Sequence, residues 1–408
     1  MAIKQTQTKV FDFSDVGLDF CVASRALIPD RFEKMLSTGY NLQTLNSVSI
    51  SGDQITFTYG GAHNYVSDRV LKVEGGPLAS INNGEFRLDS VTPTTVTFTL
   101  EGSPSSIPGG FNTYVAPLGW DQVYKEGLVH IYKMKYLDER DLYVRMLFAP
   151  ADISQSSNIQ VCVGKSFDPN TGVIDDPNAY PGMTDATEWV ASTYRWLLES
   201  GTSTGRTAYT YSQGYSTYGR GVVIGSQYHL LVMANMLSSW PKALGAILPF
   251  SSISNHEALD YPLVIATYTT RSGGGGSSAD GEWLGANGPG FLGAHRIHFW
   301  QGAAETALPT LPTAVSSALP PTIDSFNTTT AAPIPVYERS TRQFLGFVSS
   351  GLYMCQFGSS GAPSTDSTRI PDKHIDADIG VDVYIHMLAR ASSLYAFFAA
   401  PVEEIKIG

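Results

Sequence analysis

Gly164-Lys165-Ser166, in VCVGKSF, matches the last three residues of the phosphate-binding loop G-x-x-x-x-G-K-[ST]. In that motif, backbone N–H groups and the lysine surround phosphate oxygens, and a helix begins directly after the loop. Ile159 occupies the position of the first glycine, and FDPNTG follows where the helix should start. We therefore predict a strand that ends in a loop here, and no bound nucleotide.

Metal-ligating residue types gather at two other places. The stretch PDKHIDADIGVDVYIH contains Asp372, His374, Asp376, Asp378 and Asp382. Oxygen ligands at a spacing of two could bind Ca²⁺, but Ile379 stands before Gly380 where the EF-hand pattern requires an acidic residue. We expect a solvated turn before a strand, with a cation site as the alternative.

His295 and His298 lie three residues apart in AHRIHFW, where they could share a helix face or a loop. A catalytic zinc ion needs three protein ligands, and no third ligand is near this pair in the sequence. We therefore predict no catalytic zinc.

Signatures of nucleophilic catalysis are also missing from the sequence. No G-x-S-x-G elbow is present, and turn chemistry explains the serines beside glycines in GFVSSG and FGSSG. Asp175 and Asp176 are adjacent in a polar loop, where two carboxylates seldom converge on one substrate atom. We expect a protein that is not an enzyme; a hydrolase with dispersed catalytic residues is one alternative.

Eight aromatic residues are candidates for contacts with other molecules. Four are tyrosines among the small polar residues of YTYSQGYSTYG, and four lie in a stretch rich in glycine and proline. Tyrosine with serine and glycine is typical of adaptable contact surfaces, and equally of an edge hairpin with tyrosines packed across its strands. The eight residues are Tyr209, Tyr211, Tyr215, Tyr218, Trp283, Phe291, Phe299 and Trp300.

Composition narrows the class of protein. Among 408 residues, 15% are charged and the formal net charge is −11, whereas wrapping nucleic acid requires a dense basic surface. The N-terminus has no apolar segment typical of a secretory signal, and no apolar run approaches the ~18 residues of a membrane span. Cys21, Cys162 and Cys355 form no CxxC pair. We expect no nucleic-acid partner, no membrane span, no cofactor, and folding in a reducing cytoplasm.

The elements that would position these residues are mainly strands. From residue 46 onward, short runs of alternating apolar and polar residues are separated by turns, as in NNGEFRLDSVTPTTVTFTLEG, where Asn83-Gly84 is a turn pair. We predict an Ig-like β-sandwich over residues 46–117. Its core residues would be Phe57, Phe86, Leu88, Val96 and Phe98.

An arm precedes this sandwich and a larger β-rich domain follows it. Residues 1–45 would be the arm, with one short helix that begins near Asp30 and ends at Gly39. Residues 118–408 would be the larger domain, and its strands are expected over residues 128–149, 158–164, 221–234, 261–268, 343–358 and 382–407.

Two further segments of the larger domain have distinct patterns. Residues 185–201 predict a helix, because Asp185 and Glu188 fit a capping box and Gly201 fits a helix end. Residues 269–340 are rich in glycine and proline and predict a long loop excursion. As a hypothesis, this excursion is an assembly element that becomes ordered against neighbouring subunits.

The order of motifs resembles that of virion proteins of tailed bacteriophages that carry a small Ig-like module. The resemblance starts at Ala62-His63-Asn64-Tyr65 and continues through INNGEFRLDSVTPTTVTFTL. It extends into GWDQVYKEGLVHIYKMKYLDERDLYVRMLFA, where the matching positions are Trp120, Tyr124, Tyr132, Tyr143 and Arg145. It covers residues 1–265 and 340–408 and brings no catalytic residues.

The resemblance implies a structural subunit of a phage tail, baseplate or tail tip, assembled in the host cytoplasm in several copies around the tail axis. Its partners would be other copies of itself and other virion proteins. The low charge fits this expectation, because charged residues are depleted in interface cores. A receptor- or carbohydrate-binding module of a tail fibre or spike is the alternative, in which Trp120, Trp283, Trp300 and the tyrosines stack on a host surface glycan.

Overall fold

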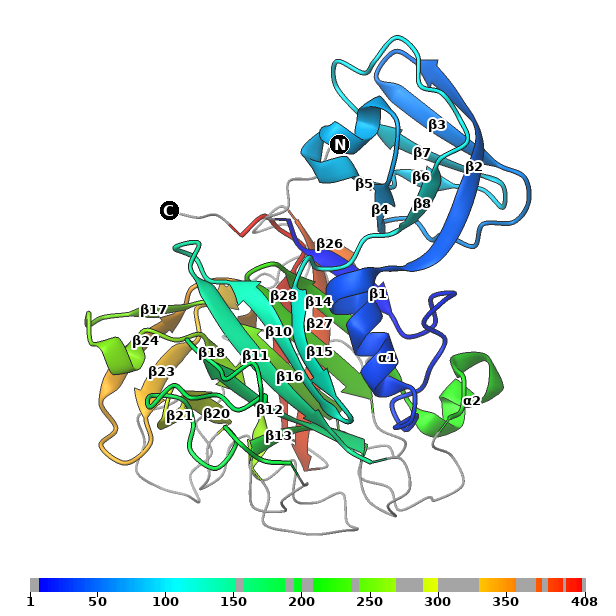
Figure 1. Cartoon of the computed structure of the whole chain (residues 1–408). Coiled ribbons are helices and arrows are strands. Elements are labelled where there is room, and N and C mark those ends of the chain that lie inside the picture. The colour runs from blue at the N-terminus through cyan, green and yellow to red at the C-terminus, as the bar shows by residue number, and fades with distance from the viewer. Residues whose placement is uncertain are drawn as a thin grey trace, which may run out of the picture.

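The computed structural model describes residues 7–150, 157–187, 194–199, 208–235, 242–268, 289–299, 330–356, 372–375, 381–391 and 394–405. These residues are mainly β, as the sequence predicts, and their strands form four sheets joined by a few short helices (Figure 1). One sheet makes a separate N-terminal β-domain, and the other three make a layered domain.

The N-terminal β-domain, residues 40–116, is one continuous sheet of seven antiparallel strands. In order across the sheet they are β5 (Glu85–Arg87), β4 (Val70–Val73), β8 (Asn112–Val115), β2 (Tyr40–Ser51), β3 (Gln54–Tyr59), β7 (Thr95–Thr99) and β6 (Ser90–Val91). The long strand β2 pairs with β8 through its first half and with β3 through its second half, so the sheet bends around it.

The bend brings the two ends of this sheet face to face. Phe86 of β5 stacks on Phe98 of β7, with 4.7 Å between the ring centroids, and Phe57 of β3 meets Phe98 edge to face at 5.1 Å. These three residues are fully buried, as are Leu88 and Val96, so the predicted core is confirmed. The Ig-like arrangement is not confirmed, because the strands form one bent sheet where two separate sheets were expected.

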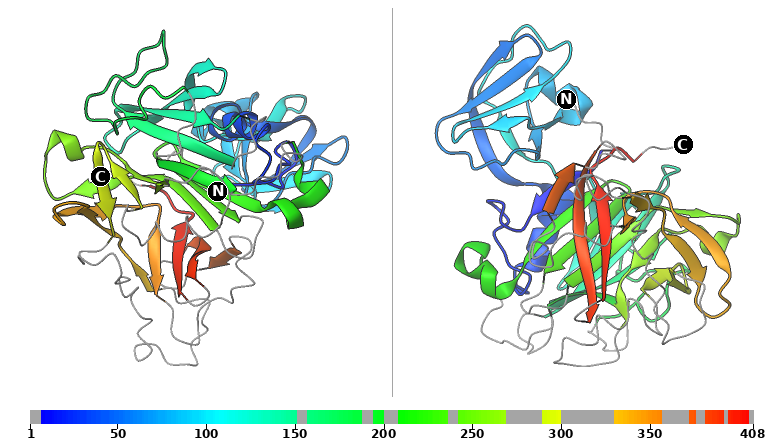
Figure 2. Two further views of the ribbon diagram at one scale, coloured as in Figure 1. Left: turned by 90° about the horizontal axis from the view of Figure 1, so that it is seen from below. Right: turned by 180° about the vertical axis from the view of Figure 1, so that it is seen from behind.

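The layered domain has three sheets stacked on one another (Figures 1 and 2). The first contains β19 (Thr267–Tyr268), β13 (Tyr194–Glu199), β12 (Ser157–Gly164), β11 (Asp141–Phe148), β10 (Val129–Lys135) and β9 (Asp121–Glu126). The middle one contains β1 (Lys9–Asp12), β14 (Arg220–Ser226), β15 (His229–Asn235), β16 (Lys242–Leu248), β18 (Leu263–Ile265), β20 (Gly290–Leu292), β21 (His295–His298), β23 (Pro335–Glu338), β24 (Phe344–Val348) and β17 (Phe250–Ser252). The third contains β22 (Thr330–Ala332), β25 (Tyr353–Gln356), β28 (Leu394–Pro401), β27 (Asp382–Ala391) and β26 (Asp372–Ile375).

Strands β14, β15 and β16 of the middle layer are buried on both faces, and their sequence shows why. In GVVIGS, Val223 belongs to the core shared with the first sheet, whereas Val222 and Ile224 belong to the core shared with the third. Leu230 and Leu231 of β15 divide between the two cores in the same way. Successive side chains of a strand point to opposite faces, so a strand covered on both sides reads as a continuous apolar run.

Part of the middle sheet closes on itself. Strand β17 continues β16 after Pro249, and β17 pairs with β24 while β16 pairs with β18. The strands from β16 through β18, β20, β21, β23 and β24 therefore form a closed circuit. Its interior is apolar and includes Phe250, Leu263, Leu292 and Val336.

The described helices are short. They are α1 (Ile28–Glu33), which continues as the π-helical turn η1 (Lys34–Thr38), the 3-10 turns η2 (Pro77–Ser80), η3 (Asn82–Gly84) and η4 (Glu257–Leu259), and α2 (Tyr211–Tyr218). The predicted arm helix is confirmed, and it ends at Gly39, whose φ of +76° favours glycine. Within the described residues, no helix has the length and apolarity needed to cross a membrane.

The helix predicted over residues 185–201 is wrong where the structure describes it. Residues 194–199 form strand β13, which pairs with β12 and β19. The Trp196 side chain is buried in the core and donates its indole N–H to the Ile265 carbonyl oxygen at 2.9 Å. Aromatic and apolar residues with partners on both sides suit a sheet, and this pairing outweighs the local capping pattern.

The predicted excursion over residues 269–340 is not confirmed as one loop. Its described parts are strands of the layered domain: residues 290–292 and 295–298 form β20 and β21, and residues 330–332 and 335–338 form β22 and β23. Residues 269–288 and 300–329 lie outside the described residues, as do Trp283 and Trp300.

Candidate functional site

The junction between the two domains is built around the N-terminal arm. Strand β1 pairs antiparallel with β14 as the outer strand of the middle sheet, in the register Lys9↔Gly225 to Asp12↔Val222. The chain then turns back in a loop that is braced by Phe13 stacked on Phe20 at 3.9 Å. The arm thus belongs to the layered domain, while its polar side chains reach the N-terminal β-domain.

Asp15 in this loop forms a buried ion pair with Arg69 of the N-terminal β-domain. The guanidinium donates Nε–H to Oδ2 at 2.7 Å and Nη2–H to Oδ1 at 2.9 Å, and the Tyr40 hydroxyl donates to Oδ2 at 2.7 Å. The side chains of Arg69 and Asp15 are only 8% and 6% exposed. Burial alone would lower the pKa of Arg69, but the charge and hydrogen bonds of Asp15 raise it above its usual value.

Lys9 makes the second buried ion pair of the junction, with Glu85 of β5. The two charged atoms are 2.7 Å apart, and the lysine ammonium also donates to the carbonyl oxygen of Pro117. The side chains are 2% and 4% exposed. Burial lowers the pKa of Lys9, and the nearby Glu85 carboxylate opposes that shift. The pair therefore joins β1 of the layered domain to β5 of the N-terminal β-domain.

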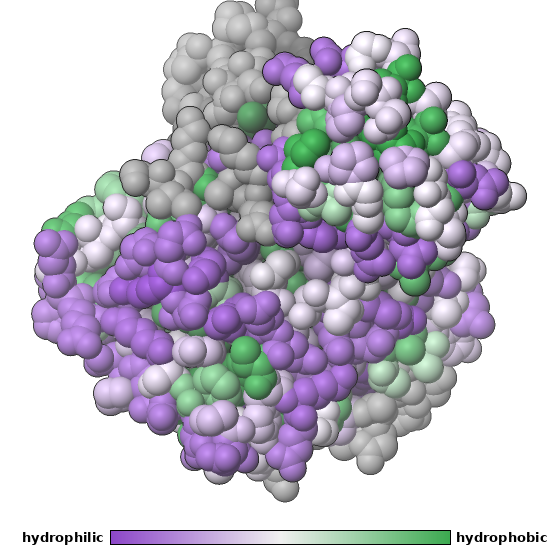
Figure 3. Space-filling view, turned by 45° about the horizontal axis from the view of Figure 1, so that its top comes forward, coloured by the Kyte–Doolittle hydropathy of each residue, from purple (hydrophilic) through white to green (hydrophobic). Residues whose placement is uncertain are grey.

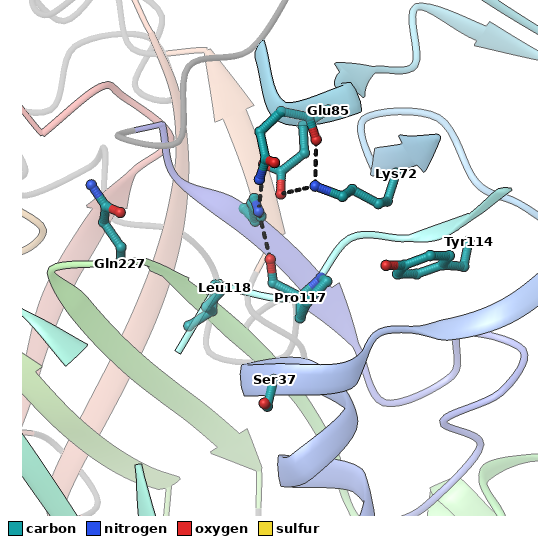
Figure 4. Close-up of a pocket in the computed structure, with 10 residues that line it drawn as sticks. Ser37, Lys72, Glu85, Tyr114, Pro117, Leu118 and Gln227 are labelled. Atoms are coloured by element: carbon teal, nitrogen blue, oxygen red, sulfur yellow. Dashed lines mark hydrogen bonds and ion pairs between the residues drawn. The ribbon is translucent and has the colours of Figure 1, made fainter. Parts of the chain in front are cut away.

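A polar pocket of about 210 Å³ lies beside this second pair. The Lys72 ammonium stands 4.0 Å from Glu85 Oε1 and donates to the Asn83 carbonyl oxygen. Ser37 of η1 and Gln227, between β14 and β15, line it from the layered side (Figure 4). The lining residues are Lys9, Ser37, Lys72, Asn83, Glu85, Tyr114, Pro117, Leu118, Gly119 and Gln227. Both amines are engaged with acceptors of the protein, which suits a fixed joint between domains.

A third contact ties the N-terminal β-domain to the outer, five-stranded sheet. Arg87 donates to Asp68 Oδ1 at 2.7 Å and to Asp382 Oδ2 at 2.8 Å. Arg87 is 34% exposed, so water screens this contact more than the two buried pairs. The apolar core is also continuous across the junction, where Phe11 of β1 contacts Tyr40 of β2.

The Gly164-Lys165-Ser166 tripeptide lies in a loop, as predicted. Gly164 ends β12, and an isolated bridge between Asp168 and Val173 follows where a phosphate-binding loop would start a helix. The Lys165 backbone N–H donates to Asp176 Oδ2 at 2.7 Å, and its ammonium lies 4.5 Å from the centre of the Tyr261 ring. The lysine therefore braces a loop.

The two candidate metal clusters are not assembled in the described residues. His295 and His298 lie on strand β21, and three residues along a strand places them on opposite faces. Asp372 and His374 lie on β26, Asp382 binds Arg87, and Asp376 and Asp378 lie outside the described residues. Across the described ranges, no group of three or more histidine, cysteine, aspartate or glutamate residues could hold a metal ion.

Two of the eight predicted aromatic contact residues are buried in the core. Phe291 is 1% exposed and packs 4.6 Å from Tyr180, and Phe299 is also buried, so both are core residues and not contact residues. Trp120, proposed to stack on sugar, is buried and donates to the Ser226 carbonyl oxygen.

The YTYSQGYSTYG stretch contains helix α2 and is not an edge hairpin. Tyr209 is half-buried, and Arg220 lies over the half-buried Tyr211 ring at 5.0 Å. The backbone of Tyr215 and Tyr218 lies in α2, but their side chains are outside the described part of the chain.

The junction residues Lys9, Asp15, Arg69 and Glu85 were not predicted from the sequence. One feature of the sequence does point to these residues: Lys9, Arg69 and Glu85 each directly precede an apolar strand residue that is buried. A charged side chain at such a position needs a partner when it is buried, but the sequence alone does not pair residues so far apart. No protein-family model and no curated protein sequence matches the chain.

Proposed function

We propose that the chain is a structural subunit of a tailed-bacteriophage virion, placed in the tail, baseplate or tail tip. Several copies surround the tail axis and contact one another and other virion proteins. The observation that carries the proposal is the buried junction of Asp15 with Arg69 and of Lys9 with Glu85.

The junction supports the proposal because a repeating assembly needs each subunit to present its domains at one fixed angle. A domain orientation that left one of these charges buried without its partner would cost several kcal/mol, so the two pairs favour one orientation among the closely packed ones. The continuous apolar core adds to this restraint. Domains joined by a flexible linker would show neither feature.

The sequence resemblance supports the same proposal from another direction. It includes the stretch from Ala62 to Leu100, which lies within the N-terminal β-domain and supplies Phe86 and Phe98 of its aromatic core. We take this domain to be a diverged Ig-like module, in which β2 joins the two halves of the sandwich into one sheet. Such modules in the resembling proteins belong to the virion.

Mass spectrometry of purified particles tests the proposal. Peptides of this chain should be found in virions of the phage that encodes it, at several copies per particle. Antibodies raised against the recombinant chain should label the tail or its tip in electron micrographs. Absence of the chain from purified particles, with its accumulation in the infected-cell lysate, would refute a structural role.

A further inference from the structure

Exposed apolar residues are unevenly distributed over the molecule. Six large apolar side chains are exposed among the described residues: Val16, Leu42, Val66, Val123, Ile253 and Phe347. All but Val123 fall into two groups. On the face shown in Figure 3, green apolar areas are likewise small and separate within a mostly polar surface. Clustered exposed apolar groups mark interaction sites more than scattered ones do.

The first group, the loop patch, consists of Val16, Leu42 and Val66. The segments that carry them meet at Asn41: a Cβ at Gly17 would lie 3.1 Å from the Asn41 backbone nitrogen, and the Tyr65 hydroxyl donates to the Asn41 carbonyl oxygen. Leu42 is 62% exposed. The loop patch therefore sits on the arm loop and the adjoining start of β2, beside the buried junction.

The second group, the hairpin patch, consists of Ile253, Tyr337, Phe344 and Phe347. Phe344 lies 4.9 Å from Phe347 and 5.4 Å from Tyr337, and Ile253 donates its backbone N–H to Leu345 on the same strand pair. Ile253 is 62% exposed and Phe347 is 43% exposed. These residues cover the outside of the strand circuit at β17, β23 and β24.

The two patches lie on opposite sides of the molecule. Strands β23 and β24 lie on the side of the molecule away from β1 and α1, both in Figure 1 and in the two views of Figure 2. In a twofold-symmetric dimer, the same patch of each copy forms the contact. In a head-to-tail contact, one patch of one copy binds a different patch of the next, and two patches on opposite sides of the molecule fit this arrangement.

The charges around the patches are complementary. Asp12 and Asp19 flank Val16, and their carboxylates accept hydrogen bonds from Ser14 and Ser212. Two cations also lie beside this loop: Arg31 and Lys34 donate to the carbonyl oxygens of Leu18 and Gly17, and both pair with Asp30. Arg339 and Arg342 lie in the turn between β23 and β24, next to Glu338, whose carboxylate accepts a hydrogen bond from the Thr341 hydroxyl. The carboxylates of Asp12 and Asp19 can therefore face the guanidinium groups of Arg339 and Arg342 when the two apolar patches touch, and this pairing of charges favours one orientation of the contact.

We infer that the loop patch of one copy docks on the hairpin patch of the next, so that the chain assembles head to tail. The inference rests on the proposed function and specifies which surfaces join neighbouring copies. Such a contact yields a closed ring when its rotation closes and a filament when it does not.

Two single variants of the full chain test the inference. Leu42→Arg blocks the loop patch and Phe347→Asp blocks the hairpin patch, while Gln54→Glu, at an exposed hairpin tip remote from both, is the matched control. By sedimentation velocity, wild type and control should associate beyond dimers. Each blocked variant alone should be monomeric, with association weakened about tenfold or more. An equimolar mixture of the two should form a one-to-one dimer, because one intact patch of each kind remains.

Other outcomes overturn the inference. If either blocked variant dimerises alone, the contact is twofold symmetric; if wild type stays monomeric at high micromolar concentration, the patches do not join copies. Loss of binding to a glycan array in Phe347→Asp, without loss of self-association, would assign the hairpin patch to sugar. Val16→Arg and Ile253→Asp provide a second pair if a first variant shows altered thermal unfolding. Presence of the chain in virions together with unaffected variants would leave the proposed function standing and refute only these surfaces.

Discussion

Replacing Asp15 by alanine should break the junction and reveal how strongly it holds the two domains. The substitution removes the carboxylate that accepts two guanidinium hydrogen bonds from Arg69 and one hydrogen bond from the Tyr40 hydroxyl. Arg69 would remain buried with its charge uncompensated. The apolar core on both sides of the junction would be unchanged, so the effect comes from the polar contacts.

The expected size of the effect follows from burial. Removing one partner of a buried ion pair costs about 3–5 kcal/mol, and Arg69 and Asp15 are 8% and 6% exposed. The orphaned Tyr40 hydroxyl adds about 1 kcal/mol. We therefore expect the free energy of unfolding to fall by about 4–6 kcal/mol. Arg87→Ala is the matched control, because Arg87 is 34% exposed and should cost about 1 kcal/mol or less.

Calorimetry and small-angle scattering together measure the outcome. All six tryptophans follow residue 117, so tryptophan fluorescence reports the layered domain while calorimetry reports the whole chain. The wild-type chain should unfold in a single calorimetric transition. In Asp15→Ala we expect two transitions and a larger radius of gyration, because the N-terminal β-domain reorients. Arg87→Ala should show neither.

The reasoning would be refuted if Asp15→Ala lost no more stability than Arg87→Ala, or if scattering showed the same shape for both. A second check uses Asp15→Asn with Arg69→Met. Removing both charges should cost less than Asp15→Ala alone, because no buried charge is left without a partner.

Three further predictions concern stability. Phe98→Ala should lower the free energy of unfolding by about 3–5 kcal/mol, since Phe98 is fully buried between two phenylalanine rings; chemical denaturation measures this. Gly245→Ala should lower the free energy of unfolding by about 1–3 kcal/mol, because the new Cβ would lie 2.4 Å from the buried Trp196 ring. Gly61→Ala is the control: its Cβ would have open space around it, so the melting temperature should not change. Burial lowers the pKa of His229 to about 3, whereas the same histidine in the unfolded chain has a pKa near 6.5. As the pH falls below about 6.5, the unfolded state therefore binds a proton that the folded state does not. The free energy of unfolding should then decrease, by about 2 kcal/mol at pH 5. In His229→Gln, denaturation at a series of pH values should show a shallower loss; an identical pH slope would contradict the assignment.

The sequence by itself determined the local β-structure of this chain. Alternation of apolar and polar residues marks the strands that contain Phe57 and Phe98, and their burial is as predicted. The arm helix ending at Gly39 was also predictable. A strand or helix of this kind depends on residues that are close together in the sequence and on which of its faces is apolar. A short stretch of sequence is therefore enough to predict it.

Only the tertiary structure decided the features that join distant parts of the chain. It turned residues 194–199 into a strand, because pairing with β12 and β19 outweighs a local capping pattern. It placed Phe291 in a core and His295 and His298 on opposite faces of a strand. It brought Asp15 to Arg69 across 54 positions and Lys9 to Glu85 across the junction. Ion pairs of this kind form wherever the fold brings opposite charges within a few ångströms, and no periodicity along the sequence encodes which charges will meet.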